Sequence, residues 1–170
     1  MFDLSGKTAI ITGAGRGLGL AMAQALSAAG ADILGVHRSP MDDCKNAVEA
    51  NGRRFVGMQA DISTDDAPQA IIDHAVATFD GLDILINNAG IIRRADTLEL
   101  DRKDWEDVID INLSAALWLS QAAARYWVRE NRSGKIINTA SMLSFQGGIR
   151  VAGYTAAKSG LLGLTRLLAN

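Results

Sequence analysis

Short apolar runs alternate with longer stretches of mixed polarity along most of the chain. The runs are rich in Ile, Leu and Val, and continuous apolar runs of this length are typical of parallel strands covered on both faces. They lie at residues 7–12, 31–36, 53–59, 82–86 and 135–139. The stretches between them have helical spacing, at residues 20–29, 41–50, 67–79 and 104–129, and a last helix runs to the end. This alternation predicts an α/β fold with a doubly wound parallel sheet.

The composition fits one domain spanning residues 1–170. Of the 170 residues, 48% are hydrophobic and 21% are charged, as in ordinary soluble globular proteins. A net charge of −2 provides no basic face for nucleic acid. No apolar run reaches membrane-spanning length, and residues 1–7 lack the pattern of a signal peptide, so we expect a cytoplasmic protein without membrane contact. The single cysteine, Cys44, fits a reducing compartment and either a packing role or a place on a helix surface.

A glycine-rich loop separates the first strand from the first helix. Gly13, Gly17 and Gly19 follow Thr12 with the spacing Gly-x-x-x-Gly-x-Gly. Glycines permit a tight turn and a close backbone approach to a pyrophosphate, while the helix after them offers free N–H groups to the phosphates. The loop therefore predicts dinucleotide binding in a Rossmann-type sheet, with a plain tight turn as the alternative.

Tyr154 and Lys158 lie four residues apart in the last helix, with Ser141 upstream. Residues at this spacing share a helix face, so an ammonium group can lie close to a phenol and favour its ionised form. The pair also arises by chance in many helices, so its meaning depends on the other motifs. Together with the glycine loop it predicts an oxidoreductase.

These motifs together resemble the short-chain dehydrogenase/reductase family. The residues that carry the likeness, in the family's order, are the glycine loop, Asn87-Asn-Ala-Gly90, Asn112, Ser141, Tyr154 and Lys158. The resemblance runs from Lys7 to the last residue. Residues 91–97 and 141–151 are similar to a branch that acts on sugar acids, which implies a role in carbohydrate metabolism.

The resemblance implies a catalytic set of Asn112, Ser141, Tyr154 and Lys158. Tyr154 would exchange a proton with the substrate, which near pH 7 asks for a pKa about three units below that of a free phenol, or roughly 4 kcal/mol. Lys158 would help to supply that stabilisation, and Ser141 would hydrogen-bond the substrate oxygen. Asn112 would anchor a water that links Lys158 to solvent, a role that rests on resemblance alone.

The expected cofactor is NADP or NAD. Its expected binding residues follow the ends of the first four strands or belong to the last helix: Gly13, Arg16, Gly17, Leu18, Gly19, His37, Arg38, Asp61, Ile62, Asn88, Ala89, Gly90, Tyr154 and Lys158. Asp61 would accept a hydrogen bond from adenine, and an equally good interpretation is a helix or turn cap. His37 and Arg38 stand where an acidic residue would bind a ribose hydroxyl, so with Arg16 they favour NADP slightly. The sugar-acid branch is instead associated with NAD.

The expected substrate is a small molecule, bound by Ser141, Gln146 and one of three arginines. Arg93, Arg94 and Arg150 lie in segments that should border the site, and a guanidinium group suits a carboxylate. Charges on exposed loops are more often simply solvated.

Other residues that invite a functional interpretation have simpler ones. Trp105, Trp118 and Trp127 lie on the long amphipathic helix, where core or subunit contacts are more common than a stacking platform. His37 and His74 have no partners at ligand spacing, so we expect no metal.

The chain stops inside its last helix with no cap after Asn170, so we expect a chain truncated before the family's substrate lid. Three hypotheses remain. They are a sugar-acid dehydrogenase, a short-chain reductase of another alcohol or ketone, and a dinucleotide-binding module without turnover. The resemblance also implies a tetramer.

Overall fold

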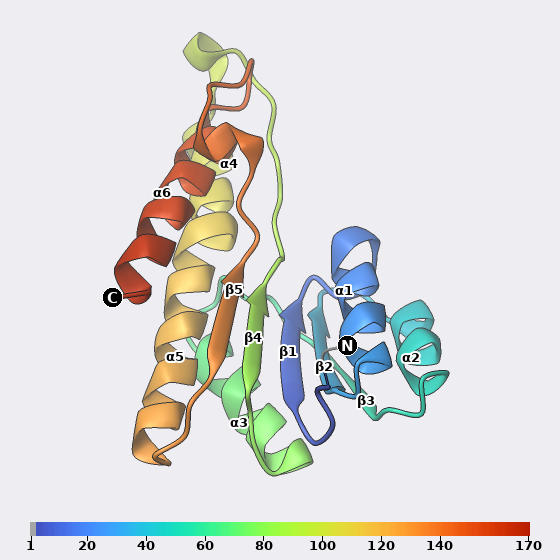
Figure 1. The fold of residues 1–170 in the computed structure, drawn as a ribbon. Helices are drawn as coiled ribbons and strands as arrows, with labels where there is room; N and C mark the ends of the chain where they lie inside the picture. The colour runs from blue at the N-terminus through green and yellow to red at the C-terminus, as the bar shows by residue number, and fades with distance from the viewer. Residues whose placement is uncertain (1–2) are drawn as a thin grey trace.

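Five strands form one parallel sheet in the order β3-β2-β1-β4-β5 (Figure 1). The computed structural model describes residues 3–170; residues 1 and 2, the first of the segment examined for a signal peptide, lie outside them. The strands are β1 (Thr8–Thr12), β2 (Asp32–His37), β3 (Phe55–Gln59), β4 (Ile84–Asn87) and β5 (Lys135–Asn138). The predicted doubly wound parallel sheet is therefore confirmed.

The central strand β1 is buried along its whole length. It pairs with β2 on one side and β4 on the other, so that Ile10 lies opposite Leu34 and Leu85. The strand order reverses at this point, and open α/β sheets bind ligands at the carboxyl edge of such a reversal. The topology therefore places a candidate site beyond Thr12.

Helices cover the two faces of the sheet unequally (Figure 1). Helices α1 (Gly17–Ala28) and α2 (Asp42–Glu49) enclose one apolar core with β1 and β2, whereas α3 (Ala67–Phe79) and α5 (Ala115–Arg129) enclose the other. On β5, Ile136 packs against the α3 and α5 side, while Ile137 on the opposite face is 48% exposed. This is because α1 and α2 lie over β1 to β3 and do not reach β5.

The predicted helix over residues 104–129 is not a regular α-helix throughout. It consists of α4 (Arg102–Ile109), a π-helical turn (Asp110–Ser114) and α5. The backbone N–H of Ala115 bonds the carbonyl of Asp110, five residues back, so one extra residue is accommodated without ending the helix. The apolar spacing did not indicate this turn, because one extra residue does not end the helix.

The last helix, α6 (Ala152–Leu168), packs against α4 and the π-helical turn. Two short 3-10 helices, Thr97–Glu99 and Met142–Ser144, were not predicted, and most other boundaries differ from expectation by one to three residues.

The three tryptophans and the single cysteine differ in how deeply they are buried. Trp127 is buried, and its indole nitrogen donates a hydrogen bond to the carbonyl of Leu82 at 2.7 Å; Trp105 and Trp118 are partly exposed. Cys44 is buried against the sheet, and burial raises the pKa of its thiol to about 11. A thiol in this state is unreactive near neutral pH, as the predicted packing role requires.

Within residues 3–170, no helix combines the length and the apolar character needed to cross a bilayer.

Candidate active site

The glycine loop turns the chain from β1 into α1 at the carboxyl edge of the sheet. Gly13 and Gly17 have φ values of +71° and +56°, which only glycine adopts without strain. A side chain on Gly19 would overlap the carbonyl oxygen of Gly13, so α1 can approach the loop only because Gly19 has none. Gly17 and Leu18, whose N–H groups belong to the first turn of α1, line the cleft described below.

A polar bridge joins the loop to the end of β4. The hydroxyl of Thr12 donates to the carbonyl of Ile86 and accepts from the backbone N–H groups of Asn88 and Ala89, both at 3.0 Å. The Asn88 side chain donates in return to the carbonyl of Thr12 at 3.0 Å. These bonds hold the segment after β4 at a fixed distance from the glycine loop.

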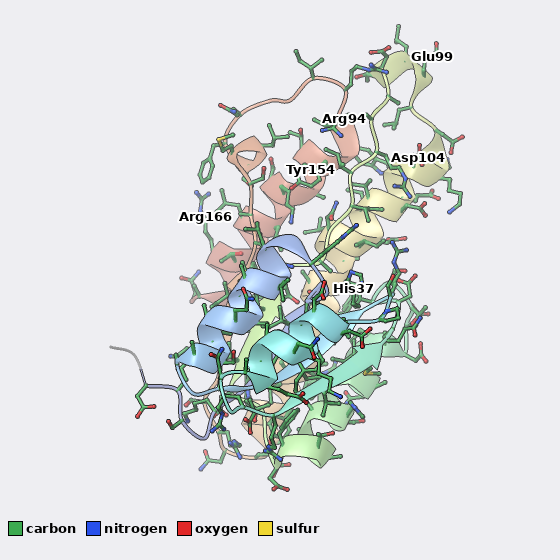
Figure 2. The ribbon with its side chains drawn as sticks, turned by 90° about the vertical axis from the view of Figure 1, so that its right-hand side faces the viewer. His37, Arg94, Glu99, Asp104, Tyr154 and Arg166 are labelled. Carbon is green, nitrogen blue, oxygen red and sulfur yellow. The ribbon has the colours of Figure 1, made fainter. Side chains whose placement is uncertain are left out.

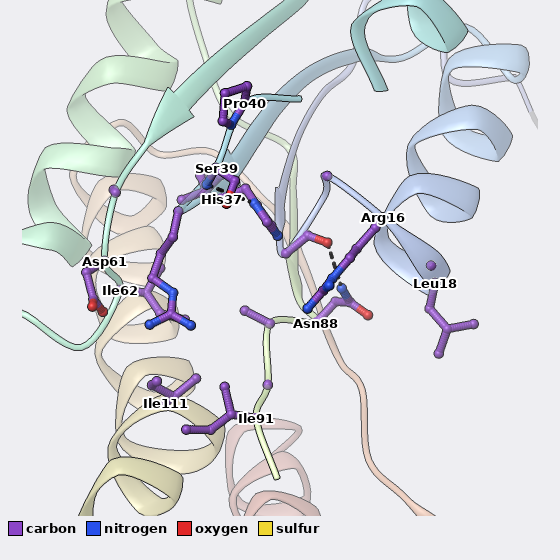
Figure 3. A pocket seen from close by; sticks show the side chains of 18 residues that line it. Arg16, Leu18, His37, Ser39, Pro40, Asp61, Ile62, Asn88, Ile91 and Ile111 are labelled. Atoms are coloured by element: carbon purple, nitrogen blue, oxygen red, sulfur yellow. Dashed lines mark hydrogen bonds between the residues drawn. The ribbon is translucent and has the colours of Figure 1, made fainter. Parts of the chain in front are cut away.

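A cleft of about 640 Å³ opens above these strand ends (Figure 3). Its lining includes eleven of the predicted cofactor residues: Gly13, Arg16, Gly17, Leu18, His37, Arg38, Asp61, Ile62, Asn88, Ala89 and Gly90. Gly19 lies behind the loop, and Tyr154 and Lys158 lie outside the lining. Sequence reasoning did not single out the other lining residues: Gly15, Val36, Ser39, Pro40, Ala60, Ile91 and Ile111. Most of them flank strand ends, and that position is the signal by which they could have been found.

One corner of the cleft is formed by residues that follow β2. The ring of His37 accepts a hydrogen bond from the backbone N–H of Ser39 through Nδ1, at 3.0 Å. The side chains of Arg16 and Arg38 border the same cleft and are exposed. No acidic side chain follows β2 directly here, so the corner can receive an additional negative group.

Asp61 serves as a turn cap and also lines the cleft. Its Oδ1 accepts from the hydroxyl of Ser63 at 2.7 Å and from the backbone N–H of Ser63 at 3.0 Å. These bonds, helped by the positive charge of Arg38, lower the pKa of the Asp61 carboxyl. Asp61 can therefore cap this turn and still face the cleft, where the predicted adenine contact would be made.

Beyond Gly90, the cleft meets a cluster formed by Asn112 and Lys158. A side chain built on Gly90 would lie 2.6 Å from Oδ1 of Asn112 and 3.9 Å from Nζ of Lys158. Asn112 is buried in the π-helical turn, and its amide both accepts from the N–H of Ile91 at 2.9 Å and donates to the carbonyl of Ile91 at 2.7 Å. Asn112 therefore fixes the backbone that forms this end of the cleft.

Lys158 lies in α6 one turn after Tyr154, and Nζ is 5.7 Å from the centre of the Tyr154 ring. Nζ also donates to the carbonyl of Thr139, at 2.6 Å, just after β5. Ser141 follows, and its hydroxyl accepts the N–H of Leu143 at 3.2 Å, which leaves its own hydrogen free to donate elsewhere. The structure thus brings three of the predicted catalytic residues to the junction of β5 and α6.

Burial changes the protonation of Lys158. Only 3% of the residue is exposed, and the loss of hydration lowers the pKa of its ammonium group from 10.5 to about 8. Burial destabilises the cation relative to its hydrated state in the unfolded chain, so the lysine weakens the fold while it is protonated. A shift of this size corresponds to about 3 kcal/mol.

We expect Lys158→Met to be more stable than the wild type at low pH, by a margin that falls as the pH rises. Below pH 8 the lysine is charged in both the folded and the unfolded states, and folding pays its full dehydration. Between pH 8 and 10.5 the folded state loses its proton first, so wild-type stability rises relative to the variant by about 3 kcal/mol. Urea denaturation of both proteins from pH 7 to 10.5 measures this difference. A margin that does not depend on pH, or a fall of the same size for Lys135→Met at an exposed position, would contradict it.

The three candidate substrate arginines differ in their partners. Arg93 pairs with Asp104 and Arg150 pairs with Asp96, each at 3.2 Å. Arg94 forms no ion pair with any residue that the structure describes, and Figure 2 shows it near the start of α6, the helix that contains Tyr154. Gln146 is exposed in the segment after β5.

Within the described part of the chain, no three His, Cys, Asp or Glu side chains gather as metal ligands.

Comparison with known proteins places this geometry in a family. The family model described as "short chain dehydrogenase" matches residues 7–170. The 2-dehydro-3-deoxy-D-gluconate 5-dehydrogenase of Escherichia coli K12 is 51% identical over 169 residues, which are 99% of this chain and 67% of that protein. The chain thus spans about two thirds of the length of this relative.

Two solved structures are similar over 99% of this chain. A proposed 2-deoxy-D-gluconate 3-dehydrogenase from Agrobacterium tumefaciens, with bound NADP, has a TM-score of 0.91 and 46% identity, and 67% of its chain is covered. Carveol dehydrogenase from Mycobacterium avium, in complex with NAD, has a TM-score of 0.92 and 29% identity, and 66% of its chain is covered.

Proposed function

The chain belongs to the short chain dehydrogenase family and is an NAD(P)-dependent oxidoreductase, and we propose that it interconverts a secondary alcohol and a ketone in a sugar acid. The candidate substrates are 2-dehydro-3-deoxy-D-gluconate and 2-deoxy-D-gluconate, named for the relative from E. coli and the similar structure from A. tumefaciens. One observation carries the proposal: at Gly90 the lining of the cleft lies directly beside the buried Asn112 and Lys158.

The residues of the cleft fit a dinucleotide. Its volume of about 640 Å³ lies within the usual range for ligand pockets, and Gly13, Gly15 and Gly19 leave backbone space that side chains would fill. The N–H groups at the start of α1 suit a pyrophosphate, and Asp61 suits a hydrogen-bond donor such as the adenine amino group. When bound, the nicotinamide accepts or supplies the hydride of the reaction.

The residues of the chain then handle the proton and the substrate oxygen. In oxidation, Tyr154 accepts the proton of the substrate hydroxyl, and in reduction it returns a proton to the forming alcohol. Ser141 donates its free hydroxyl hydrogen to the substrate oxygen and so stabilises the charge that develops there. Lys158, with its Nζ close to the Tyr154 ring, favours the ionised phenol while it is protonated.

The cofactor preference that we propose is NADP, by a small margin. Arg16 and Arg38 border the corner after β2, and two guanidinium groups favour a ribose 2′-phosphate over a hydroxyl. His37 is held by Ser39 with Nδ1 as the acceptor, so Nε2 bears the ring proton and can donate to either group. NAD is therefore also accommodated.

We propose that Arg94 binds the carboxylate of the substrate. We expect Arg94→Leu to raise KM for the sugar acid by about 10- to 100-fold, because a hydrogen-bonded charge pair contributes roughly 1.5–3 kcal/mol. The KM of the dinucleotide should not change. Arg93→Leu and Arg150→Leu are matched controls, since each of these arginines already has an aspartate partner. An unchanged KM in Arg94→Leu, or equal increases in all three variants, would refute this assignment.

The experiment that tests the function is a measurement of NAD(P)H absorbance with each sugar acid and each cofactor separately, alongside a direct titration of dinucleotide binding. Turnover with a sugar acid and a lower KM for NADP than for NAD are the expected results. Dinucleotide binding without turnover on any sugar acid would favour the other two hypotheses, a reductase of another alcohol or ketone or a binding module.

We further propose that residues 1–170 form one dinucleotide-binding and catalytic domain, that the protein works in the cytoplasm, and that it assembles as a tetramer. The partly exposed Trp118 on α5 and the exposed Leu167 on α6 support subunit contacts through these helices. Size measurement by light scattering tests the assembly.

A further inference from the structure

The segment between β5 and α6 carries Ser141 but has little apolar anchorage. Met142, which begins the short 3-10 helix, and Phe145, which follows it, are 76% and 75% exposed. Figure 1 shows the segment rising from the end of β5 to the start of α6, beyond the sheet. Because so few apolar side chains are buried here, the position of the segment depends on its hydrogen bonds.

Ser144 uses both sides of its hydroxyl group to join this segment to α6. Its Oγ accepts the backbone N–H of Ser141 at 3.2 Å and donates its hydrogen to the backbone carbonyl of Lys158 at 2.7 Å. One hydroxyl therefore links the backbone of Ser141 to the backbone of Lys158. Neither bond involves the reactive end of either residue.

The link completes a ring of interactions around the catalytic cluster. Nζ of Lys158 donates to the carbonyl of Thr139, two residues before Ser141. The Lys158 side chain thus holds the start of the segment, while its carbonyl, through Ser144, holds the part that bears Ser141. A further contact, from the hydroxyl of Ser159 to the carbonyl of Leu143 at 3.3 Å, lies on the exposed side of the same junction.

We infer that Ser144 is a positioning residue that sets the location of the Ser141 hydroxyl relative to Tyr154 and Lys158, an inference that rests on the proposed function. Ser141 and Ser144 lie on one segment, while the proton-transferring pair lies on α6. A substrate oxygen must reach both Ser141 and Tyr154 at hydrogen-bond distance, and a displacement of about 1 Å can cost 100-fold in rate. Ser144 supplies the bond that prevents this displacement.

Kinetics of Ser144→Ala, Ser144→Thr and Ser159→Ala test the inference in the intact protein. We expect Ser144→Ala to lower kcat by about 10- to 100-fold without changing KM for the dinucleotide. Ser144→Thr retains the hydroxyl and should recover most of the activity. Ser159→Ala removes a longer contact from the same junction and should retain near wild-type kcat.

A double-mutant cycle with Ser141→Ala separates positioning from a general loss of stability. If Ser144 acts through Ser141, removing its hydroxyl from Ser141→Ala should cause little further loss of kcat. Full multiplication of the two losses would overturn the inference, as would unchanged kcat in Ser144→Ala.

Hydrogen exchange gives a readout that does not depend on turnover. In Ser144→Ala, the backbone amides of Ser141 and Leu143 should exchange faster, with no change at the glycine loop. Unchanged exchange at both amides would overturn the inference even if the protein is active. Faster exchange in a protein that turns over no sugar acid would support the Ser144 link and refute only the proposed function.

Discussion

Replacing Tyr154 by Phe should lower kcat for the sugar acid by about 10³-fold, the range expected when a general acid–base group is removed. The variant loses only the phenolic oxygen, so the ring beside Lys158 and the packing of α6 remain. Dinucleotide affinity should stay close to that of the wild type, because the lining of the cleft does not include Tyr154. Steady-state kinetics and a dinucleotide titration measure the two effects separately.

Tyr126 provides a matched control for this substitution. It is the only other tyrosine of the chain, and it is buried in α5, in the core that α3 and α5 form with the sheet. Tyr126→Phe should retain the wild-type kcat. Equal losses of kcat in both variants would indicate a general effect of removing a tyrosine hydroxyl, and wild-type kcat in Tyr154→Phe would exclude Tyr154 as the proton-transferring group.

Replacing Gly19 by Ala should weaken dinucleotide binding by about 100-fold, or roughly 2.7 kcal/mol. The added methyl group would overlap the carbonyl oxygen of Gly13, and it would also lie 2.8 Å from the side-chain nitrogen of Asn88. To remove this overlap, the loop must move away from α1, and this movement would separate the N–H groups of α1 from the phosphates of the dinucleotide. The free energy of unfolding should also fall by about 1–3 kcal/mol, as for other overpacked sites.

The same substitution at Gly163 is the control. Gly163 lies in α6, and a methyl group there would have no neighbour within 4 Å. Because alanine favours helix more than glycine does, Gly163→Ala should stabilise the protein by up to about 1 kcal/mol and leave dinucleotide binding unchanged. Isothermal titration and urea denaturation compare the variants. Undiminished dinucleotide affinity in Gly19→Ala would show that the loop does not need this close approach.

The sheet and most of the cleft could be predicted because their signals are local. The buried run of β1 and the glycines after it each occupy consecutive positions, and parallel strands bring their carboxyl ends to one edge. His37 at the end of β2 was predicted to line the cleft from its position in the chain, and Asp61 after β3 from that position together with the family resemblance.

Bonds between distant segments could not be predicted in this way. The side chain of Asn112 accepts from the backbone N–H of Ile91, and Nζ of Lys158 donates to the carbonyl of Thr139. The hydroxyl of Ser144 donates to the carbonyl of Lys158 and so joins the segment after β5 to α6. Each of these bonds links a side chain to a backbone group more than ten residues away, and neither apolar spacing nor local propensity records such a partner. The π-helical turn was not predicted either, although it is local, because one extra residue does not end the helix.

The π-helical turn fixes the number of residues between α4 and α5. Val108 on α4 is buried where α4 packs on α6, whereas Ala115, Leu119 and Tyr126 on α5 are buried toward the sheet. The extra residue within 110–114 sets the angle between these two buried faces, because each residue advances the side-chain direction by about 100° around the helix axis. A deletion of one residue there could still form a regular α-helix, but either Val108 would turn away from α6 or the buried face of α5 would turn away from the sheet. The number of residues at this point is therefore under tighter constraint than loop length elsewhere, because it sets the orientation of two packed helix faces at once.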